Sequence, residues 1–401
     1  MRIAYVAPYK GPTVLEQRTI LRGLSLSNTI KIELLAGLMR RAGHDVEVIS
    51  IGEVVDSRFK MYRGCVENRP FDPAVPVYYA SSMPIRFLNG LWSSYWTLNY
   101  LKSRHRAMPF DLVVIFNLKR PHVACANYAV RRGLPVILEY EDDSYVDVGG
   151  RRTSSIIEVL HQRSFKQVIG RVSGGIGVSP HLLSQLPADV PKLLLRGVVG
   201  DDIVKSSQEL RQAKQNWILF SGTHVPSNGV DRLIEAWGTG LPGWQLHITG
   251  QGQLTDHLKE MASGKRDIVF HGLVSREKLV HLLCSARICI NPHMVSDTPG
   301  NVFAFKIMEY IAAGAHCVTT PMGDLERDVE AGITYMPDNT PAAIATTLRS
   351  VIDGRRYEQI APDAALRSYG THAVSNSLSE LFQATTAQRH LRAADLTPSY
   401  R

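Results

Sequence analysis

Residues 217–250, WILFSGTHVPSNGVDRLIEAWGTGLPGWQLHITG, contain two apolar runs separated by a glycine-containing loop and a partly apolar stretch. The runs WILF and WQLHITG are predicted to be strands, and residues 229–237 between them are predicted to be a helix. A strand, a helix and a second strand in this order form one parallel unit with a right-handed crossover. The stretch therefore predicts an α/β fold.

The same alternation continues on both sides of this stretch. Helices are predicted at 253–262 and 276–285, each followed by a short strand, DIVFHG and RICINP. Nearer the N-terminus, the strands RIAYVA, DLVVIF and LPVILEY alternate with helical patterns. We therefore predict two Rossmann-like, doubly wound domains that face each other across a cleft, with a ligand at the carboxyl ends of the strands.

A chain of 401 residues is too long for one ordinary hydrophobic core, so two domains are expected. Residues 198–214 are polar, carry mixed charge and show little apolar periodicity, which favours a connection between domains. The predicted organisation is an N-terminal acceptor-side domain at 1–197, a linker at 198–214 and a nucleotide-sugar domain at 215–370. A C-terminal helix and tail at 371–401 are expected to cross back to the first domain.

Composition excludes several classes of protein. A hydrophobic content of 44% and a charged content of 20% are typical of a globular chain. The five cysteines include no C-x-x-C pair, so neither a disulfide framework nor a zinc site is expected, and a cytoplasmic location is predicted. The first predicted strand is too short for the apolar core of a signal peptide. The sequence contains no uncharged apolar run long enough to predict a membrane span.

The net charge of +8 is moderate, and we expect the excess to be spread along the chain. Such a charge permits nucleotides, lipid phosphates or an acidic membrane face as partners and selects none of them. No nucleic-acid partner is predicted.

The loop at 221–229 follows a strand and precedes a helix, the order that directs backbone N–H groups at a phosphate. Gly222 and Gly229 allow such a turn, although a glycine loop is also common in any parallel α/β protein. A second candidate is 301–321, NVFAFKIMEYIAAGAHCVTTP, a helix followed by a strand. Its only charges are Lys306 and Glu309, which are either a structural salt bridge or a cradle for phosphate and ribose hydroxyl groups.

Two stretches of the first half have competing interpretations. The acidic run EYEDD, 139–143, is an exposed strand end, a group that orients an acceptor hydroxyl through Glu141, or a metal site formed by Glu139, Glu141 and Asp143. We prefer the interpretations in which this run binds no metal ion. The stretch RFLNGLWSSYWTLNYLKSRHR, 86–106, is either a helix packed in the core or an amphipathic helix that rests on anionic lipid.

Several segments taken together resemble the group 1 glycosyltransferases, the large retaining family (family four) with the GT-B fold. The segments SGTHVPSNGVDRLIEAW, LHITGQGQ, IVFHGLVSREKL, ICINP and FAFKIMEYIAAGAHCVTT follow the family's order and spacing over about 216–350. The run from Lys306 to Gly314 is similar to the family pattern K-x-x-E-Y-x-A-x-G. In the first half, AGHDVEVIS and LPVILEYED resemble family segments more weakly.

The resemblance implies transfer of a hexose, with retention, from a UDP- or GDP-sugar to an acceptor hydroxyl. The setting would be biosynthesis of a cell-surface polysaccharide, a glycolipid or a natural-product glycan. No cofactor is implied beyond the nucleotide-sugar co-substrate, and the acceptor is a glycan, a lipid-linked molecule or a small molecule. A location of the protein on the inner face of the membrane, as a peripheral protein, is the alternative to a cytoplasmic one.

The resemblance also implies site residues. Glu309 would hold the ribose of the donor, Lys306 would face the diphosphate and sugar, and Glu141 stands where many relatives have a histidine. The implied catalytic residues are Glu141, Lys306 and Asn301. The implied donor-binding residues are Gly11, Gly222, Thr223, Asn228, Gly272, Val274, Phe303, Ala304, Phe305, Lys306 and Glu309.

Three positions depart from the family pattern. Asn301 stands where the family often has a second glutamate, and an amide cannot stabilise positive charge. Thr223 or His224 and Asn228 stand where the family often has an arginine and a lysine. These departures leave two alternatives open: a non-catalytic partner that binds a nucleotide-sugar or glycan, and a nucleotide-sugar epimerase with the same architecture.

Overall fold

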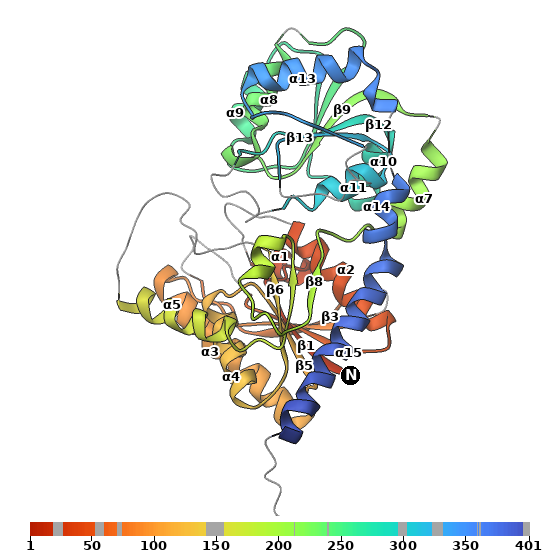
Figure 1. The fold of residues 1–401 in the computed structure, drawn as a ribbon. Helices are drawn as coiled ribbons and strands as arrows, with labels where there is room; N and C mark the ends of the chain where they lie inside the picture. Colours follow the sequence, from red (N-terminus) through yellow and green to blue (C-terminus); the bar gives the residue numbers. More distant parts are fainter. Residues whose placement is uncertain are drawn as a thin grey trace, which may run out of the picture. The chain divides into compact units, whose positions relative to one another are not determined.

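The computed structural model describes residues 1–18, 27–52, 60–69, 74–141, 156–211, 213–238, 240–295, 303–322, 332–358, 360 and 362–395. Of these, residues 1–18, 28–195 and 374–395 belong to one compact unit, unit 1, and those from 196 to 373 belong to a second, unit 2. Each unit contains its own sheet, with helices around it (Figure 1).

Unit 1 is built on an eight-stranded sheet in the order β3-β4-β2-β1-β5-β6-β7-β8. All neighbouring strands are parallel except β3 and β4, which pair in antiparallel fashion at one edge. Every residue of β1, β5 and β6 is buried, which agrees with sequences that are apolar except for Arg2 in β1 and Glu139 in β6. The strands are β1 (Arg2–Val6), β2 (Asp45–Ser50), β3 (Cys65–Arg69), β4 (Val75–Tyr79), β5 (Leu112–Phe116), β6 (Val136–Tyr140), β7 (Gly174–Gly177) and β8 (Lys192–Leu194).

The helices of unit 1 cover both faces of this sheet. In Figure 1, α3, α4 and α5 lie on one face, and α2 and α15 lie on the other. This division follows from right-handed crossovers, because the chain moves one way across the sheet after β1 and the opposite way after β4. The helices are α1 (Pro12–Gln17), α2 (Ser27–Arg41), α3 (Arg86–Ala107), α4 (Arg120–Arg131), α5 (Ile156–Ile169), α6 (Pro180–Ser184) and α15 (Thr371–Asp395).

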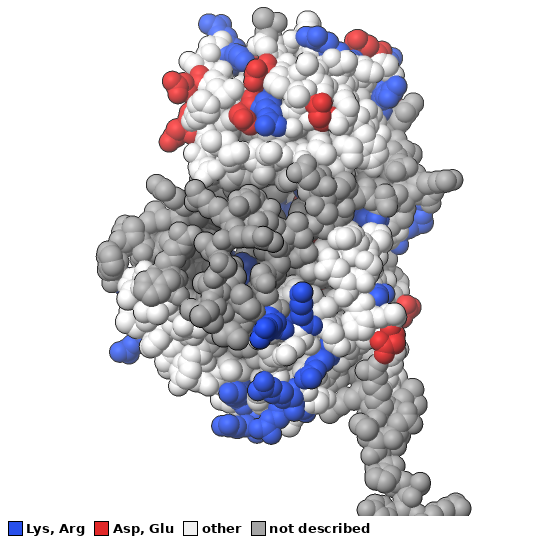
Figure 2. All heavy atoms as spheres, turned by 60° about the vertical axis from the view of Figure 1, so that its left-hand side comes forward, with Lys and Arg blue, Asp and Glu red and all other residues white. Residues whose placement is uncertain are grey.

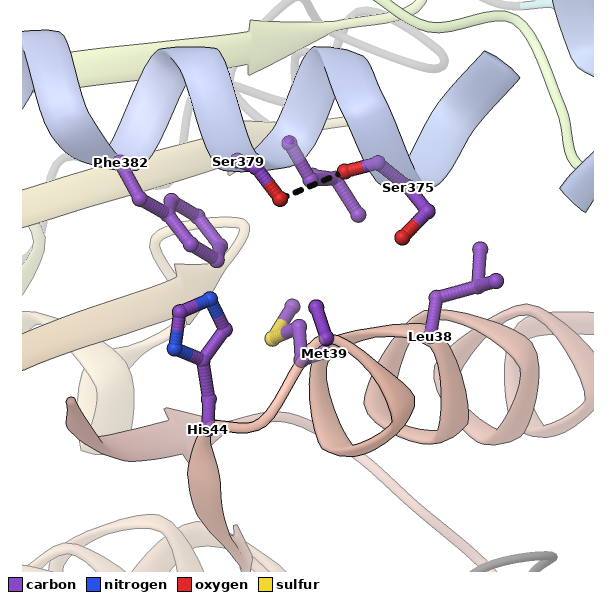
Figure 3. A pocket seen from close by; sticks show the side chains of 8 residues that line it. Leu38, Met39, His44, Ser375, Ser379 and Phe382 are labelled. Atoms are coloured by element: carbon purple, nitrogen blue, oxygen red, sulfur yellow. Dashed lines mark hydrogen bonds between the residues drawn. The ribbon is translucent and has the colours of Figure 1, made fainter. Parts of the chain in front are cut away.

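Helix α15, near the C-terminal end of the described chain, packs on α2. Figure 3 shows Leu38 and Met39 of α2 facing Ser375, Ser379 and Phe382 of α15 around a small gap. The ring of His44 meets that of Phe382 edge-on at 5.6 Å, and burial lowers the pKa of this histidine. The helix from Val374 onward is therefore part of the core of unit 1, although the rest of that unit ends at Leu195.

Unit 2 is built on a six-stranded, all-parallel sheet in the order β11-β10-β9-β12-β13-β14. Numbered within the unit, this is 3-2-1-4-5-6, the doubly wound order of nucleotide-binding domains. The strands are β9 (Gln215–Ser221), β10 (Gln245–Thr249), β11 (Ile268–Gly272), β12 (Ala286–Asn291), β13 (His316–Thr319) and β14 (Ile333–Tyr335). The helices are α7 (Asp201–Leu210), α8 (Val230–Trp237), α9 (Thr255–Met261), α10 (Arg276–Ser285), α11 (Lys306–Ala312), α13 (Pro341–Asp353) and α14 (Pro362–Tyr369), with short 3-10 turns η1 (Pro226–Asn228) and η2 (Arg356–Glu358). The prediction of two Rossmann-like α/β domains is confirmed.

The predicted linker takes a different form. Within 198–214, residues Asp201–Leu210 form α7, which packs against α10 and α11 inside unit 2. Asp201 and Asp202 lie in the first turn of α7, where the helix dipole favours negative charge. Ile203 is the fully buried residue of this helix, so the stretch has little of the apolar periodicity from which a packed helix is predicted.

Candidate functional site

The strand order of unit 2 reverses between β9 and β12, and such a switch point opens a crevice at the carboxyl ends of the strands. The loop 221–229 leaves β9 at this place, and α11 follows β12 along the chain. The two segments singled out from the sequence are therefore brought together by the topology of the sheet.

Consecutive glycine loops line this edge. The N–H of Gly222 donates to the Thr249 carbonyl at 3.3 Å, and the N–H of Gly250 donates to the Gly272 carbonyl at 2.8 Å. A Cβ on Gly250 would lie 1.9 Å from the Gly222 carbonyl oxygen, so only glycine fits between these loops. The loops after β9, β10 and β11 thus form one tightly joined rim, which includes Gly272; Val274 follows it, half-buried.

The loop after β9 is braced by its own side chains. The Asn228 amide donates to the Thr223 carbonyl at 2.6 Å, so this amide supports the loop and adds no cation to it. His224 is buried, and its Nδ1 lies 3.0 Å from Thr255 Oγ1. His224 and Asn228 lie at positions where the family often has an arginine and a lysine. Neither side chain adds a fixed positive charge to this loop.

Lys306 begins α11 and points its ammonium at the start of this loop. Its Nζ donates to the Ser221 carbonyl at 3.2 Å and lies 4.5 Å from the centre of the Phe220 ring. Within the described part of the chain, no carboxylate lies within salt-bridge distance of Lys306. Burial without such a partner lowers the pKa of Lys306 to about 8. The charge is therefore uncompensated beside a loop suited to an anion.

Tyr310, one turn further along α11, fixes the helix to the same loop. Its hydroxyl accepts from the Ser221 N–H and donates to the Ser221 carbonyl, both at 3.2 Å. Ser221 is thus held by two side chains of α11, Lys306 and Tyr310. This arrangement sets the distance between the ammonium and Gly222, where an added Cβ would lie 3.3 Å from Lys306 Nζ.

Glu309 pairs with Arg276, not with Lys306. Arg276 Nη1 lies 2.6 Å from Glu309 Oε1, and the same guanidinium binds Asp202 of α7 at 2.7 and 3.2 Å. The interpretation of Lys306 and Glu309 as a mutual salt bridge is therefore wrong. Burial raises the pKa of the Glu309 carboxyl, and the charge of Arg276 opposes that rise.

Arg276 and Asp202 are the site residues that sequence reasoning missed. Arg276 stands at the start of α10, immediately after its N-cap Ser275, in a segment already recognised as similar to the family. Asp202 was hidden in the stretch interpreted as a linker. Sequence spacing does not reveal these contacts, because Arg276 is 33 residues from Glu309 and 74 residues from Asp202.

The segment before α11 is packed against the start of unit 2. Phe303 is buried, and the Arg196 guanidinium lies 5.7 Å from the centre of its ring. Phe305 closely approaches Gly197, where a Cβ would lie 3.2 Å from the Phe305 ring. The Ala304 carbonyl accepts from the N–H of Ile307 at 3.0 Å. Asn301 lies outside the described residues.

In unit 1, Glu141 belongs to a buried ion cluster. Lys31 Nζ lies 3.2 Å from Glu139 Oε1 and also bonds the Glu141 carboxylate, while the Tyr5 hydroxyl donates to Glu139. Burial alone would lower the pKa of Lys31, but the two carboxylates raise it above its ordinary value. The Glu141 N–H donates to Asn117 Oδ1 at 2.8 Å, which fixes the chain at the end of β6.

This cluster corrects the interpretation of the acidic run as an exposed strand end, and the metal site stays an untested hypothesis. The strand end is not exposed, since Glu139 is completely buried. The cation that its carboxylates bind is an ammonium, and within the described ranges no group of three or more His, Cys, Asp or Glu is arranged to hold a metal ion. Asp143, the third proposed ligand, lies outside the described residues.

Gly11 caps the N-terminus of α1 and is buried in unit 1. A Cβ there would lie 2.4 Å from the Tyr79 hydroxyl oxygen and 2.7 Å from the Tyr9 ring. Tyr79 in turn donates to Glu67 at 2.8 Å. Close packing of aromatic side chains therefore explains the glycine, and a role toward the donor sugar stays a prediction.

Comparisons with known proteins relate both the site and the fold to glycosyltransferases. Residues 215–353 match the family model described as Glycosyl transferases group 1. Sucrose-phosphate synthase from Thermosynechococcus elongatus has a similar structure, with a TM-score of 0.71 and 15% identity over 98% of this chain and 100% of that one. HepE of Anabaena in complex with UDP has a TM-score of 0.61 and 16% identity over 96% and 100% of the two chains.

An epimerase has a similar structure too. The UDP-GlcNAc 2-epimerase from Neisseria meningitidis, bound to UDP-GlcNAc, has a TM-score of 0.57 and 13% identity over 96% of this chain and 100% of that one. A search of curated proteins found no match. At these identities the structural likeness shows the fold, two Rossmann-like domains of the GT-B type.

Proposed function

We propose that this protein is a glycosyltransferase that moves a hexose, with retention, from a UDP- or GDP-sugar to an acceptor hydroxyl. The observation that carries the proposal is the ammonium of Lys306, which has no carboxylate partner in the described part of the chain and lies beside Gly222. Lys306 and Glu309 both lie within the stretch that matches the family model. The proposed product is a cell-surface polysaccharide, a glycolipid or a natural-product glycan.

The main chemical task of unit 2 is to stabilise the charge of the departing nucleoside diphosphate. Lys306 and the N–H groups of the loop after β9 would contact the phosphates, and fixed cations and dipoles of this kind stabilise developing negative charge. No metal ion is needed for this task in the proposal. The acceptor hydroxyl would attack on the face that the diphosphate leaves, which retains the configuration of the sugar.

Glu309 would accept hydrogen bonds from the two ribose hydroxyls. Arg276 binds its Oε1, which leaves Oε2 for the ligand and holds the carboxylate in one orientation. The loop with Gly272 and Val274 would line the base. Support for a uridine nucleotide comes from HepE, which has been solved with UDP and with UDP-glucose.

In unit 1, Glu141 would orient the acceptor hydroxyl. Its contact with Lys31 holds the Glu141 side chain at the end of β6, where a carboxylate oxygen would accept a hydrogen bond from the hydroxyl. The proposed acceptor is a glycan, a lipid-linked molecule or a small molecule, and the proposed location is the cytoplasm. Asn301 and Gly11 are kept as proposed contacts of the transferring sugar.

Two other functions are tested by the same experiment. An epimerase is favoured by the structural likeness to epimerases of Listeria monocytogenes and Neisseria meningitidis, at 11% and 13% identity. A non-catalytic binding partner is favoured by Asn228, whose amide serves the loop where the family has a cation.

The full chain is incubated with labelled UDP- and GDP-sugars, with and without a panel of glycosyl acceptors. Released nucleoside diphosphate and an α-configured product from an α-linked donor support the retaining transferase. Interconversion of the donor sugar supports the epimerase, and saturable binding with no turnover supports the binding partner. An inverted product would contradict the retaining mechanism while leaving the donor site in place.

A further inference from the structure

The polarity of α3 is inverted along its first half. Asn89, Ser93 and Thr97, four residues apart, face inward with exposed fractions of 8%, 4% and 0%. Leu91 and Tyr95 face outward at 56% and 59%. A helix that packs on a sheet normally shows the opposite pattern. The helix does pack on unit 1, as the core interpretation of this stretch requires, but its large outward side chains are not part of that core.

The inward polar groups have partners. Asn89 Oδ1 accepts from the Met83 N–H at 2.9 Å and from Ser82 Oγ at 3.2 Å, and the Thr97 hydroxyl donates to the Ser93 carbonyl at 2.7 Å. These small residues let α3 lie close to the rest of unit 1 without its large side chains. The outward orientation of those side chains is thus built into the helix and not a packing defect.

The outward side chains form one aromatic and aliphatic surface. Trp96 meets Tyr95 at 5.5 Å and Trp92 at 6.0 Å between ring centres, both edge-on. Trp92 is fixed by a bond from its Nε1 to Ser81 Oγ at 3.0 Å. Leu88 and Ile85 extend the exposed surface toward the N-terminal end. Tyr and Trp, with an apolar body and a polar tip, are the side chains enriched at membrane interfaces.

Positive charge is concentrated around the same helix. Residues 73–138 contain eight Lys or Arg and one acidic residue, Asp111, a net charge of +7 in a chain whose total is +8. The expectation that the excess charge is spread along the chain is therefore wrong. No Asp or Glu occurs within α3 itself.

Except for Lys119 at the N-cap of α4, the basic side chains that the structure describes in this stretch lie at the C-terminal ends of α3 and α4. Lys102 Nζ and the Arg132 guanidinium lie over the same Tyr128 ring, at 5.7 and 5.9 Å from its centre, and Arg106 and Arg131 are exposed. Figure 2, which brings the side with these helices forward, shows Lys and Arg side chains gathered at its lower end. Tyr95 and Lys102 are seven residues apart, about 10 Å along one side of the helix.

We propose that this face of unit 1 binds the surface of an anionic phospholipid bilayer. The face consists of Ile85, Leu88, Leu91, Tyr95 and Trp96, followed by Lys102, Arg106, Arg131 and Arg132. The apolar part enters the boundary between headgroups and acyl chains, and the basic part contacts lipid phosphates. No described helix is long and apolar enough to cross a membrane, so this contact is peripheral.

The charge distribution favours lipid over a second copy of the chain. Two such faces in contact would bring like charges together, which opposes self-association. An anionic bilayer satisfies the charged and the apolar part at once. The inference does not depend on the proposed donor site, because every residue of the face belongs to unit 1.

The full chain is tested by flotation with vesicles of phosphatidylcholine alone and of phosphatidylcholine with about 30% phosphatidylglycerol, an anionic surface. Binding is expected only with phosphatidylglycerol, and is expected to fall sharply in about 0.5 M NaCl, which screens charges beyond a few Å. The double variant Arg131→Gln/Arg132→Gln should bind about 25-fold more weakly, at roughly fivefold for each charge. Its control, Arg355→Gln/Arg356→Gln on unit 2, should bind like the parent.

The apolar part is tested with Leu91→Ser/Tyr95→Ser, which should bind at least about tenfold more weakly. Met61→Ser/Val66→Ser is the matched control, since both residues are exposed to a similar extent elsewhere in unit 1. Melting curves show that each variant is folded. With vesicles of brominated phosphatidylglycerol, quenching of tryptophan fluorescence is expected in the parent and should decrease in Trp96→Phe.

Three results would overturn the proposal. The first is no binding to the anionic vesicles, and the second is equal binding by the parent and both variants of the face. The third is concentration-dependent self-association of the parent that Leu91→Ser/Tyr95→Ser abolishes, which would assign the face to a second copy of the chain.

Discussion

Two buried lysines of this protein, one in each unit, differ in what surrounds them. Lys31 in unit 1 contacts the carboxylates of Glu139 and Glu141, which raise its pKa above the ordinary value. Lys306 in unit 2 contacts a carbonyl oxygen and an aromatic ring, and its pKa is lowered to about 8. Both ammonium groups lie near the carboxyl ends of parallel strands.

The difference shows what makes a buried lysine available to a ligand. At Lys31 the positive charge is already compensated, so an added anion would meet two negative charges as well as one positive charge. At Lys306 the cost of burying a charge is not offset by an ion pair, and a phosphate would supply the missing partner. Position in the fold alone would not distinguish the two residues.

The largest effect is expected from Lys31→Met. Removal of the ammonium leaves two neighbouring carboxylates without their cation, and breaking a buried ion pair in this way costs about 3–5 kcal/mol. The free energy of unfolding of unit 1, measured by urea denaturation, should fall by about that amount. Lys306→Met is the comparison and should leave the stability of unit 2 nearly unchanged or raise it. Equal losses for the two variants would remove the distinction between the lysines.

The next largest effect is expected from Lys306→Met on donor binding. Charge-assisted hydrogen bonds contribute about 1.5–3 kcal/mol, so the Kd for UDP measured by calorimetry should rise by about 10- to 150-fold. Lys259→Met removes an exposed lysine of α9 in the same unit and should leave the Kd unchanged. The proposed phosphate contact is refuted by a Kd that stays the same in Lys306→Met.

A smaller and more selective effect is expected from Glu309→Gln. If Glu309 binds the ribose diol, this variant should bind UDP about tenfold more weakly. It should bind 2′-deoxy-UDP with little further loss, because one of the hydroxyls is already missing. A variant that loses the same factor for both nucleotides would show that Glu309 acts only by holding Arg276.

The smallest effect concerns pH. The protonated form of Lys306 binds the diphosphate, and the anion raises the pKa of that lysine in the complex. UDP affinity should therefore be nearly constant well below the pKa of about 8 in the free protein, fall about twofold at that pH and about fourfold half a unit above it. The parent and Lys306→Met are titrated together from neutral pH upward. A decrease of equal slope in both proteins would assign the pH dependence to another group.

Much of the fold could be predicted because its signals are local. Strands such as β5, LVVIF, are short apolar runs buried along their whole length, and alternation with helices determines a parallel sheet. α7 could not be predicted, because a helix that buries little more than Ile203 resembles a polar connection. Its apolar side consists of Ile203, Val204 and Leu210 alone, too few residues for a clear helical period.

For the candidate site, only relations between residues of the same helix or strand could be predicted. Lys306 and Glu309 are three residues apart on one helix, so their common place could be predicted from the sequence. The contacts of Arg276 with Glu309 and of Lys31 with Glu141 depend on how distant elements pack, which no local spacing encodes. By contrast, the concentration of charge in residues 73–138 was readable from the sequence and was missed.

The division of the chain has a consequence for its synthesis. Unit 2 lies between Leu195 and Val374, so the helix that completes unit 1 leaves the ribosome only after unit 2. At roughly 5–20 residues per second, the intervening residues delay that helix by roughly 10 to 35 s. During this interval the apolar side of α2, with Leu38 and Met39, has no covering helix. We therefore expect the nascent first half to expose apolar surface that favours aggregation until α15 is made.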